Sequence, residues 1–127
     1  MPRTYSHPPS SPSGALAETL AANYLQQQGL TILARNLRCR LGELDVIAWD
    51  GECVVFVEVR LRQQQRYGGA AASITSHKQH RLIQAARYWL AGAGQRWAQR
   101  PMRFDCVLLH RLEPPQLEWL KGAFDAY

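Results

Sequence analysis

Cysteines and long hydrophobic runs are both scarce in this 127-residue chain. The three cysteines, Cys39, Cys53 and Cys106, are odd in number, widely spaced and include no CxxC pair, which argues against a disulfide framework and against a zinc site. No stretch approaches the ~20 apolar residues that cross a bilayer, and the first residues lack the hydrophobic run of a secretory signal. We therefore expect a soluble, cytoplasmic protein that has no membrane partner.

The chain also lacks internal repeats and the common catalytic and nucleotide-binding motifs. It contains no GxxxxGK[ST] phosphate loop, no GxGxxG, no HExxH and no GxSxG. A function that depends on one of these motifs is therefore not indicated.

Basic residues outnumber acidic ones, and 13 of the 15 basic residues are Arg. The net charge is +5, and the segment from Arg35 to Arg103 contains 12 basic and 5 acidic residues. Because the planar guanidinium group binds phosphate with two hydrogen bonds, this segment favours a nucleic-acid partner. Ordinary solvation of an Arg-rich protein explains the same charge equally well.

Length and composition predict one domain with a single core, since 46% of the residues are apolar. Residues 1–13 are rich in Pro and Ser and carry no apolar periodicity, so we expect a disordered tail there and a single domain over residues 14–127.

Apolar periodicity predicts helices and strands along the domain. We expect one helix over residues 15–28, capped by Ser13 and ended by Gly29, and a second from a capping box at Ser76–Gln79 to Gly92. Strands are expected over residues 30–37, 44–49, 53–61, 103–110 and 116–121, the first three as a meander.

The strands over residues 44–49 and 53–61 are joined at Asp50-Gly51, a strong hairpin signal. With a two-residue loop, Asp45 faces Phe56 and becomes a diagonal neighbour of Glu58. A four-residue loop would place Asp45 directly opposite Glu58, whereas a three-residue loop would send the two carboxylates to opposite faces. The pairing of these acids therefore requires an even loop.

Alternation of side chains along the hairpin predicts two distinct faces. One face carries Glu43, Asp45, Ile47, Val54, Phe56, Glu58 and Arg60, and the other carries Leu44, Val46, Ala48, Val55, Val57, Val59 and Leu61.

Two carboxylates beside an apolar sheet raise one another's pKa unless a cation neutralises them. Hard oxygen ligands of this kind suit Mg²⁺ or Mn²⁺, and Arg60 adds a positive charge two positions after Glu58. The layout is typical of metal-dependent enzymes that cleave phosphodiester bonds. The alternative is an exposed strand end at which Glu58 and Arg60 form an ion pair in solvent.

Glu18 lies beside the apolar stripe of the first predicted helix. The small residues Ala21 and Ala22 one turn later would let the helix approach the sheet, so that this carboxylate points toward Asp45 and Glu58. An exposed glutamate in the first turn, favoured by the helix dipole, is the competing interpretation and the better one from the sequence alone.

Two further segments are candidates for contacts with nucleic acid. The Gly- and Ala-rich segment 62–72 contains Arg62, Arg66 and Tyr67, which suit a phosphate or a base, although a simple surface linker explains them equally well. The first turns of the second helix carry His77, Lys78, His80 and Arg81, either facing the substrate or forming a solvated basic face. By contrast, we expect Asp105, within an apolar strand, to pair with an arginine for structural reasons.

Several of these motifs occur together in a known family. The order of Glu18, GELDVIA, VVFVEVR, YGGAAAS, SHKQHRL and RFDCVLL resembles the YraN-like uncharacterised family, from about Gly14 to Phe124. The fold of that family is similar to PD-(D/E)xK nucleases and archaeal Holliday-junction resolvases. The resemblance implies a single nuclease-like α/β domain with a restriction-endonuclease-like core, in which helices flank a mixed sheet of about five strands.

The resemblance also implies roles for individual residues. Asp45 and Glu58 would bind Mg²⁺ or Mn²⁺, Glu18 would reach the metal directly or through water, and Lys78 with Gln79 would form the polar helix start near the site. The superfamily pattern ends in Lys, where this chain has Arg60. Arginine keeps the charge but does not act as a general base, which leaves Lys78 as the candidate amine.

Three functions remain open at this point. The first is a metal-dependent endonuclease acting on DNA, branched or single-stranded. The second is a non-catalytic nucleic-acid-binding module on the same scaffold, and the third is a protein-interaction module. Superfamily relatives that resolve junctions are dimers, so the resemblance allows a homodimer.

Overall fold

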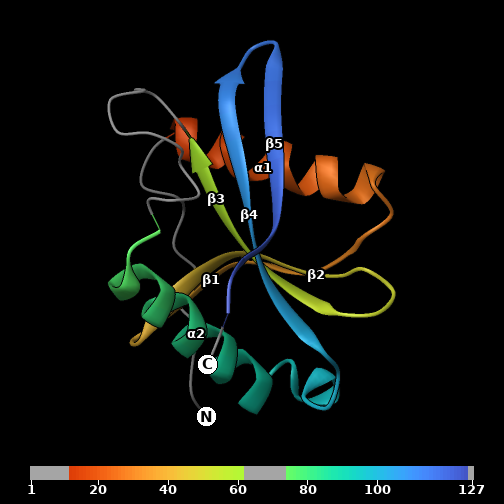
Figure 1. Cartoon of the computed structure of the whole chain (residues 1–127), viewed down its shortest axis with the longest axis vertical. Coiled ribbons are helices and arrows are strands. Elements are labelled where there is room, and N and C mark those ends of the chain that lie inside the picture. Colours follow the sequence, from red (N-terminus) through yellow and green to blue (C-terminus); the bar gives the residue numbers. More distant parts are fainter. Residues whose placement is uncertain (1–11, 62–73, 126–127) are drawn as a thin grey trace.

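The computed structural model describes residues 12–61 and 74–125. Its elements are α1 (Pro12–Gln27), β1 (Thr31–Cys39), β2 (Gly42–Trp49), β3 (Val54–Leu61), α2 (Ser76–Ala91), the 3-10 helix η2 (Gln95–Trp97), β4 (Met102–Leu112) and β5 (Pro115–Phe124). The strands form one sheet in the order β1-β2-β3-β4-β5 (Figure 1). The predicted α/β fold with a mixed sheet flanked by helices is confirmed. No helix in the described parts of the chain is long and apolar enough to cross a membrane.

The direction of the strands follows from the connections between them. The strands β1, β2 and β3 pair antiparallel, as the predicted meander requires, and β4 and β5 also pair antiparallel. The pair β3 and β4 is parallel, and α2 lies in the connection between them. A parallel pair needs such a crossover because the chain must return to the same end of the sheet.

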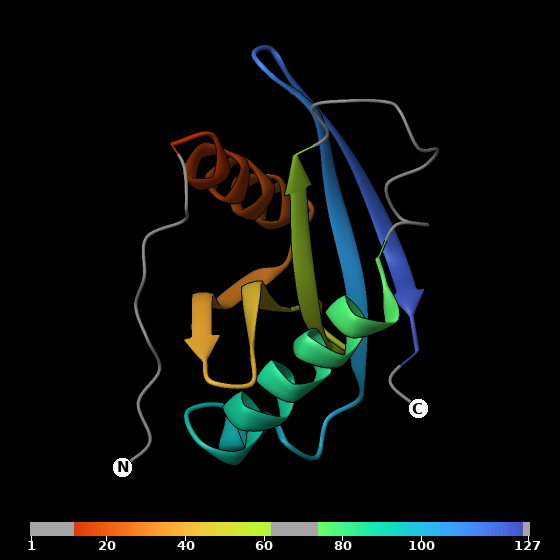
Figure 2. The ribbon, with the colours of Figure 1, turned by 90° about the vertical axis from the view of Figure 1, so that its left-hand side faces the viewer.

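The two helices cover opposite faces of the sheet (Figure 2). The face toward α1 includes Val46, Ala48, Val55 and Val57, which pack with small residues of the helix. The face toward α2 includes Ile47, Val54 and Phe56, with Trp89 of the helix. The predicted alternation is confirmed for these residues. Leu44 is the exception, since it packs in the cluster on the α2 side.

The sheet forks between β2 and β3, which explains the position of Leu44. Their paired residues run from Trp49–Val54 to Val46–Val57. Residues 42–44 continue to pair with β1, while residues 58–61 continue to pair with β4. The strands separate beyond Val46 and Val57, so simple alternation across the pair no longer applies there. Asp45 and Glu58 are the first residues of the two diverging arms.

The predicted two-residue hairpin loop is wrong, and the four-residue alternative is confirmed. Trp49 pairs with Val54, so the turn comprises residues 50–53. Asp50 explains the length, because its Oδ1 atom accepts hydrogen bonds from the backbone N–H groups of Glu52 at 2.8 Å and Cys53 at 2.6 Å. These bonds close a longer turn than the Asp-Gly pair would form alone. The loop is even, as the pairing of the acids requires.

Two predicted helix caps also differ from the structure. The helix α1 begins at Pro12, ahead of the expected domain start, so Ser13 lies inside the helix. Proline suits a first turn because its missing N–H needs no partner there. The cap of α2 is Thr75 in place of Ser76, and its side chain accepts a hydrogen bond from the Lys78 N–H at 3.1 Å. The end of α1 before Gly29, at φ +98°, and the end of α2 at Gly92 are confirmed.

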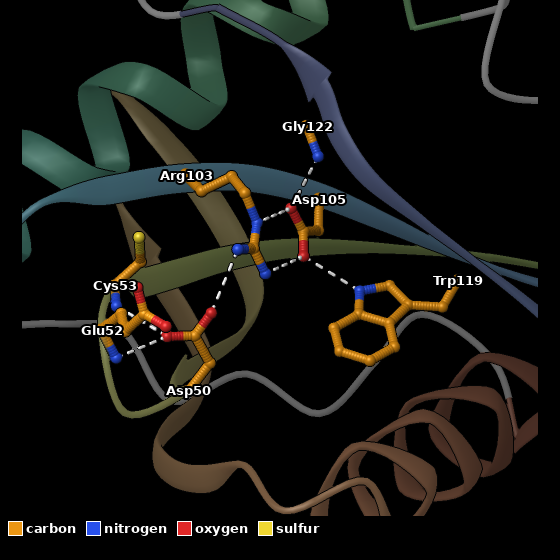
Figure 3. A network of polar contacts seen from close by, with 7 residues as sticks. All are labelled: Asp50, Glu52, Cys53, Arg103, Asp105, Trp119 and Gly122. Atoms are coloured by element: carbon orange, nitrogen blue, oxygen red, sulfur yellow. Dashed lines mark hydrogen bonds and ion pairs between the residues drawn. The ribbon is translucent and has the colours of Figure 1, made fainter.

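Asp105 of β4 is 1% exposed and has the structural role expected of it. Arg103 donates to both of its oxygens, from Nε at 2.8 Å and Nη2 at 3.0 Å, and also binds Asp50. The Trp119 indole and the Gly122 N–H complete the network at 2.9 Å each (Figure 3). The predicted Asp–Arg pairing is confirmed, and it ties the hairpin turn to β4 and β5.

Candidate active site

A polar cavity of about 350 Å³ lies in the fork of the sheet. Its walls come from the first turns of α1, the end of β1, the diverging arms of β2 and β3, and the beginning of α2. The lining residues are Gly14, Ala17, Glu18, Arg38, Glu43, Asp45, Glu58, Val59, Leu61 and Lys78. Residues from four separate parts of the sequence therefore meet in one place.

Four carboxylates line this cavity, those of Glu18, Glu43, Asp45 and Glu58, and all of them except Glu43 are buried. Glu18, Asp45 and Glu58 are 6%, 9% and 6% exposed. Asp45 is fixed to the neighbouring strand, because its Oδ2 atom accepts a hydrogen bond from the Val59 N–H at 2.8 Å. The burial of Glu18 shows that the competing interpretation, an exposed glutamate, is wrong. The small residues Ala17, Ala21 and Ala22, all buried, allow α1 to lie close to the sheet.

The close approach of these acids changes their protonation. Burial, the charge of Asp45 and a hydrogen bond between the two carboxyl groups raise the pKa of Glu58 to about 8, although Lys78 and Arg60 oppose the rise. Burial and then Asp45 also raise the pKa of Glu18. At neutral pH, Glu58 is therefore mainly protonated without an added cation, and a bound cation would displace that proton.

Lys78 connects two of the acids from the first turn of α2. Its Nζ atom lies 3.4 Å from Oε2 of Glu58 and 3.2 Å from Oε1 of Glu43. Burial lowers the pKa of Lys78, but the charges of Glu58, Glu43 and Asp45 raise it overall. The amine is therefore charged and directed into the cavity.

Arg81, one turn further along α2, binds the same glutamate. Its Nη2 atom lies 2.6 Å from Oε2 of Glu43. This hydrogen bond outweighs partial burial and lowers the pKa of Glu43. Gly42 permits the close approach of α2, because a methyl group there would overlap the backbone carbonyl of Arg81. Glu43 thus holds the beginning of α2 against β2.

Sequence reasoning placed Glu43 on the same face as Asp45 and Glu58 but gave it no role in the site, and it missed Arg38. The Nη1 atom of Arg38 is 3.8 Å from Oδ1 of Asp45 and has no hydrogen-bond partner among the described residues. The sequence contained a signal for Glu43, because this residue lies two positions before Asp45 on the same strand. In addition, Lys78 and Arg81 are three positions apart on a predicted helix, so both side chains can contact one partner. Arg38 had no comparable signal.

The other predicted residues lie in different places. Arg60 lines an adjoining cavity of about 420 Å³ with Glu58, Thr75 and Lys78. Gln79 donates its side-chain N–H to the Ile74 carbonyl at 3.0 Å and so supports the start of α2. The three candidates Arg62, Arg66 and Tyr67 fall outside the described residues.

The donor set suits a hard divalent cation held by two carboxylates. In residues 12–61 and 74–125, no group of three or more His, Cys, Asp and Glu side chains is arranged to hold a metal ion. A pair is nevertheless sufficient for Mg²⁺, which usually retains several waters and is bound through one or two carboxylates with substrate phosphates. Burial and then the charge of Asp45 raise the pKa of Glu58, and a cation bound between the two carboxylates would oppose that rise. Asp45 and Glu58 therefore fit such an ion.

Comparison with known proteins gives consistent results along the chain. The model of the uncharacterised protein family UPF0102 matches residues 17–109. A UPF0102 protein of Nitrosomonas europaea is 52% identical over 112 residues, which cover 88% of this chain and 92% of the relative. One from Pseudomonas aeruginosa is 47% identical over 120 residues, covering 92% and 95%. Another, from Methylobacillus flagellatus, is 46% identical over 110 residues, covering 87% and 94%.

Proposed function

Starting from the fact that this chain belongs to the uncharacterised protein family UPF0102, we propose that it is a Mg²⁺- or Mn²⁺-dependent endonuclease that hydrolyses phosphodiester bonds in DNA. The observation that carries the proposal is the pair of buried carboxylates, Asp45 and Glu58, at the fork of the sheet, beside the charged amine of Lys78. A buried acid pair next to a cation suits charge stabilisation during transfer at phosphorus.

In this proposal Asp45 and Glu58 would hold the ion, and Glu18 would reach it directly or through water. Asp45 is oriented for this role because its Oδ2 atom accepts a hydrogen bond from the Val59 N–H, while its Oδ1 atom lies 3.8 Å from Arg38. Glu58 contributes only after losing its proton, since its pKa is about 8. The bound ion would withdraw charge from the scissile phosphate and lower the pKa of the attacking water.

Two cations take the roles that a single strand lysine has in the superfamily pattern. Lys78 lies beside Glu58 and supplies an amine that can donate a proton or stabilise developing negative charge. Arg60 is placed next to Glu58 along β3 and supplies permanent positive charge, because guanidinium does not deprotonate in proteins. The amine thus comes from α2 and the fixed charge from the sheet.

The choice of DNA follows from the charge of the chain. Twelve basic and five acidic residues lie between Arg35 and Arg103, and this segment contributes Arg38 and Lys78 to the cavity. Positive charge around a small acidic site attracts a polyanion while keeping the metal ligands negative. The proposal includes branched or single-stranded DNA as the substrate and the cytoplasm as the location. The predicted homodimer is an additional expectation, which sedimentation would test.

The test is cleavage of labelled DNA with Mn²⁺ by the wild type and by Asp45→Asn and Asp45→Ala. Asparagine keeps an oxygen that can accept the Val59 N–H but removes the charge that would hold the ion. We expect at least a ~100-fold loss of rate in both variants. Glu52→Gln is the matched control, because it removes a carboxylate from the exposed hairpin turn. Equal cleavage by the wild type and both Asp45 variants would show that the activity belongs to a contaminant.

The second candidate is a non-catalytic nucleic-acid-binding module. It is favoured by the contacts of Lys78 with Glu43 and Glu58, which place a positive charge among the acids without a metal. In that case, DNA binding should survive both Asp45→Ala and a chelator, and no divalent ion should bind to the wild type in calorimetry. Metal binding that is lost in Asp45→Ala would contradict this candidate.

A further inference from the structure

The longest segment without acidic residues begins directly after Glu58. Residues 59–104 contain no Asp or Glu but include nine basic residues, all Arg except Lys78. The described part of this segment comprises the end of β3, α2, η2 and the beginning of β4. The helix α2 and the following η2 therefore carry only basic charged residues, and no carboxylate lies near them in the sequence.

The helix α2 leads from the cavity toward the other end of β2. At its beginning, Lys78 and Arg81 bind Glu43 near the start of β2. After its end, η2 brings Trp97 against Trp49, the last residue of β2, with ring centroids 5.0 Å apart. Figure 2 shows α2 running diagonally across the sheet, with the following segment at its far end. The helix thus spans the distance between the candidate site and a pair of tryptophans.

This tryptophan pair is flanked by two exposed arginines. The guanidinium of Arg96 lies 5.1 Å from the ring centre of Trp97, and that of Arg100 lies 5.8 Å from the ring centre of Trp49. Both rings are partly exposed, and Arg87 is exposed on α2 between the pair and the site. Within residues 12–61 and 74–125, no ion pair involves Arg87, Arg96 or Arg100. Their charges are not neutralised by the described part of the fold.

We propose that Trp49, Trp97, Arg96 and Arg100 form a second binding site, for an unpaired stretch of a nucleic-acid strand. The exposed guanidinium groups contact the phosphates and move off the rings, and a base stacks on the indole surface that they uncover. Arginine with partly exposed aromatic rings is the combination that single-stranded nucleic acids require, because unpaired bases expose their faces for stacking. A duplex hides these faces within its own stack.

This inference deepens the proposed function by naming an unpaired strand as the substrate region, but it does not depend on cleavage. The helix α2 has 16 residues, so it is about 24 Å long. At the ~3.4 Å per phosphate of a strand in duplex geometry, this length corresponds to about seven nucleotides, and a more extended unpaired strand would cover it with fewer. The exposed Arg87 would contact the strand between the two sites. A single strand that reaches from the tryptophan pair to the cavity would be cut at a fixed distance from the bound bases.

Binding should be measured by fluorescence anisotropy with a labelled, non-self-complementary 20-nucleotide single strand. The protein carries Asp45→Asn and EDTA is present, so that no cleavage occurs and failure of the proposed function cannot affect the result. The test variant is Arg96→Gln with Arg100→Gln. The matched control is Arg111→Gln with Lys121→Gln, which also removes two exposed positive charges, one of them beside a tryptophan, Trp119 at 4.4 Å.

We expect the test variant to weaken binding at least ~10-fold and the control to weaken it about twofold or less. Loss of two phosphate contacts should also reduce the dependence of log Kd on log salt by about 1.4. Equal weakening by the two double variants would overturn the proposal, because it would indicate only a general effect of charge. No binding to nucleic acid at physiological salt would also overturn it and leave a protein partner as the occupant.

Stacking is tested separately by Trp97→Leu and by a duplex of the same sequence. The variant should weaken single-strand binding at least ~5-fold, and the duplex should bind the parent protein more weakly than the single strand. Equal affinity for the duplex and the single strand, with no effect of Trp97→Leu, would overturn the role of base stacking. Thermal melting followed by circular dichroism establishes that the variant is folded, and the surface arginine variants test the same site if it is not.

Discussion

Replacing Glu58 with Gln should stabilise the metal-free protein at neutral pH. The side chain is 7% exposed, and its pKa rises from an ordinary value of 4.5 to about 8, mainly because of burial and then the charge of Asp45. The folded protein therefore holds a proton between pH 4.5 and 8 that the unfolded chain releases. The corresponding stability is fully present below pH ~4.5 and is lost as the pH rises to about 8.

The expected size follows from the two pKa values. Each pH unit within this window changes the free energy of unfolding by at most ~1.4 kcal/mol, so a rise from pH 5 to pH 7 should remove up to ~3 kcal/mol through this group. Glutamine has a similar shape, stays neutral and can still donate a hydrogen bond to Asp45. Its loss of the contact with Lys78 makes the net gain at pH 7 smaller, about 2 kcal/mol.

The assay is urea denaturation in EDTA at several pH values between 5 and 8. The difference in stability between the wild type and Glu58→Gln isolates this group from the other acids. Glu52→Gln is the control, because it removes a carboxylate from the exposed hairpin turn. In a parallel series without EDTA, Mn²⁺ should restore stability to the wild type at pH 8 but not to Glu58→Gln. Parallel pH profiles for the wild type and Glu58→Gln would refute the reasoning.

Three further substitutions test other parts of the structure. Lys78→Met should lower Mn²⁺-dependent cleavage at least ~100-fold, with partial recovery in Lys78→Arg, and an unchanged single-turnover rate would contradict the role of the amine. Gly42→Ala should lower the free energy of unfolding by about 2 kcal/mol, because its methyl group would overlap the Arg81 carbonyl; denaturation at the wild-type midpoint would argue against that close approach. Asp105→Asn should cost about 3 kcal/mol, measured in the same way, since Arg103 loses its bidentate partner; wild-type stability would show that the network of Figure 3 is dispensable.

The hairpin shows which part of the site could be predicted from the sequence. Strand alternation was sufficient to bring Asp45 and Glu58 together for any even loop, so the acid pair did not depend on the exact turn. The length of the turn was not predictable, because Asp50 also binds Arg103, 53 positions later in the chain, at 3.0 Å. A local preference for an Asp-Gly turn carries no information about such a distant partner.

The positions of Glu18 and Glu43 show the limit of sequence patterns. Periodicity placed Glu18 at the edge of a buried stripe, where the sequence alone favoured an exposed side chain, and the packing of α1 against the sheet buries it instead. The contacts of Glu43 depend on how closely α2 approaches Gly42, which is a tertiary property. Patterns within one element predict its apolar face, whereas polar contacts between elements depend on their final distance.

The separation of β2 from β3 gives the carboxylate pair a mechanical property. Asp45 and Glu58 lie where β2 and β3 are no longer joined by backbone hydrogen bonds. The hydrogen bond from the Val59 N–H to the Asp45 side chain connects the two strands there. An ion bound by both carboxylates would hold the ends of β2 and β3 closer together, and its release would let them separate. Slower hydrogen exchange at the Val59 amide after Mn²⁺ is added would show this effect directly, without any substrate.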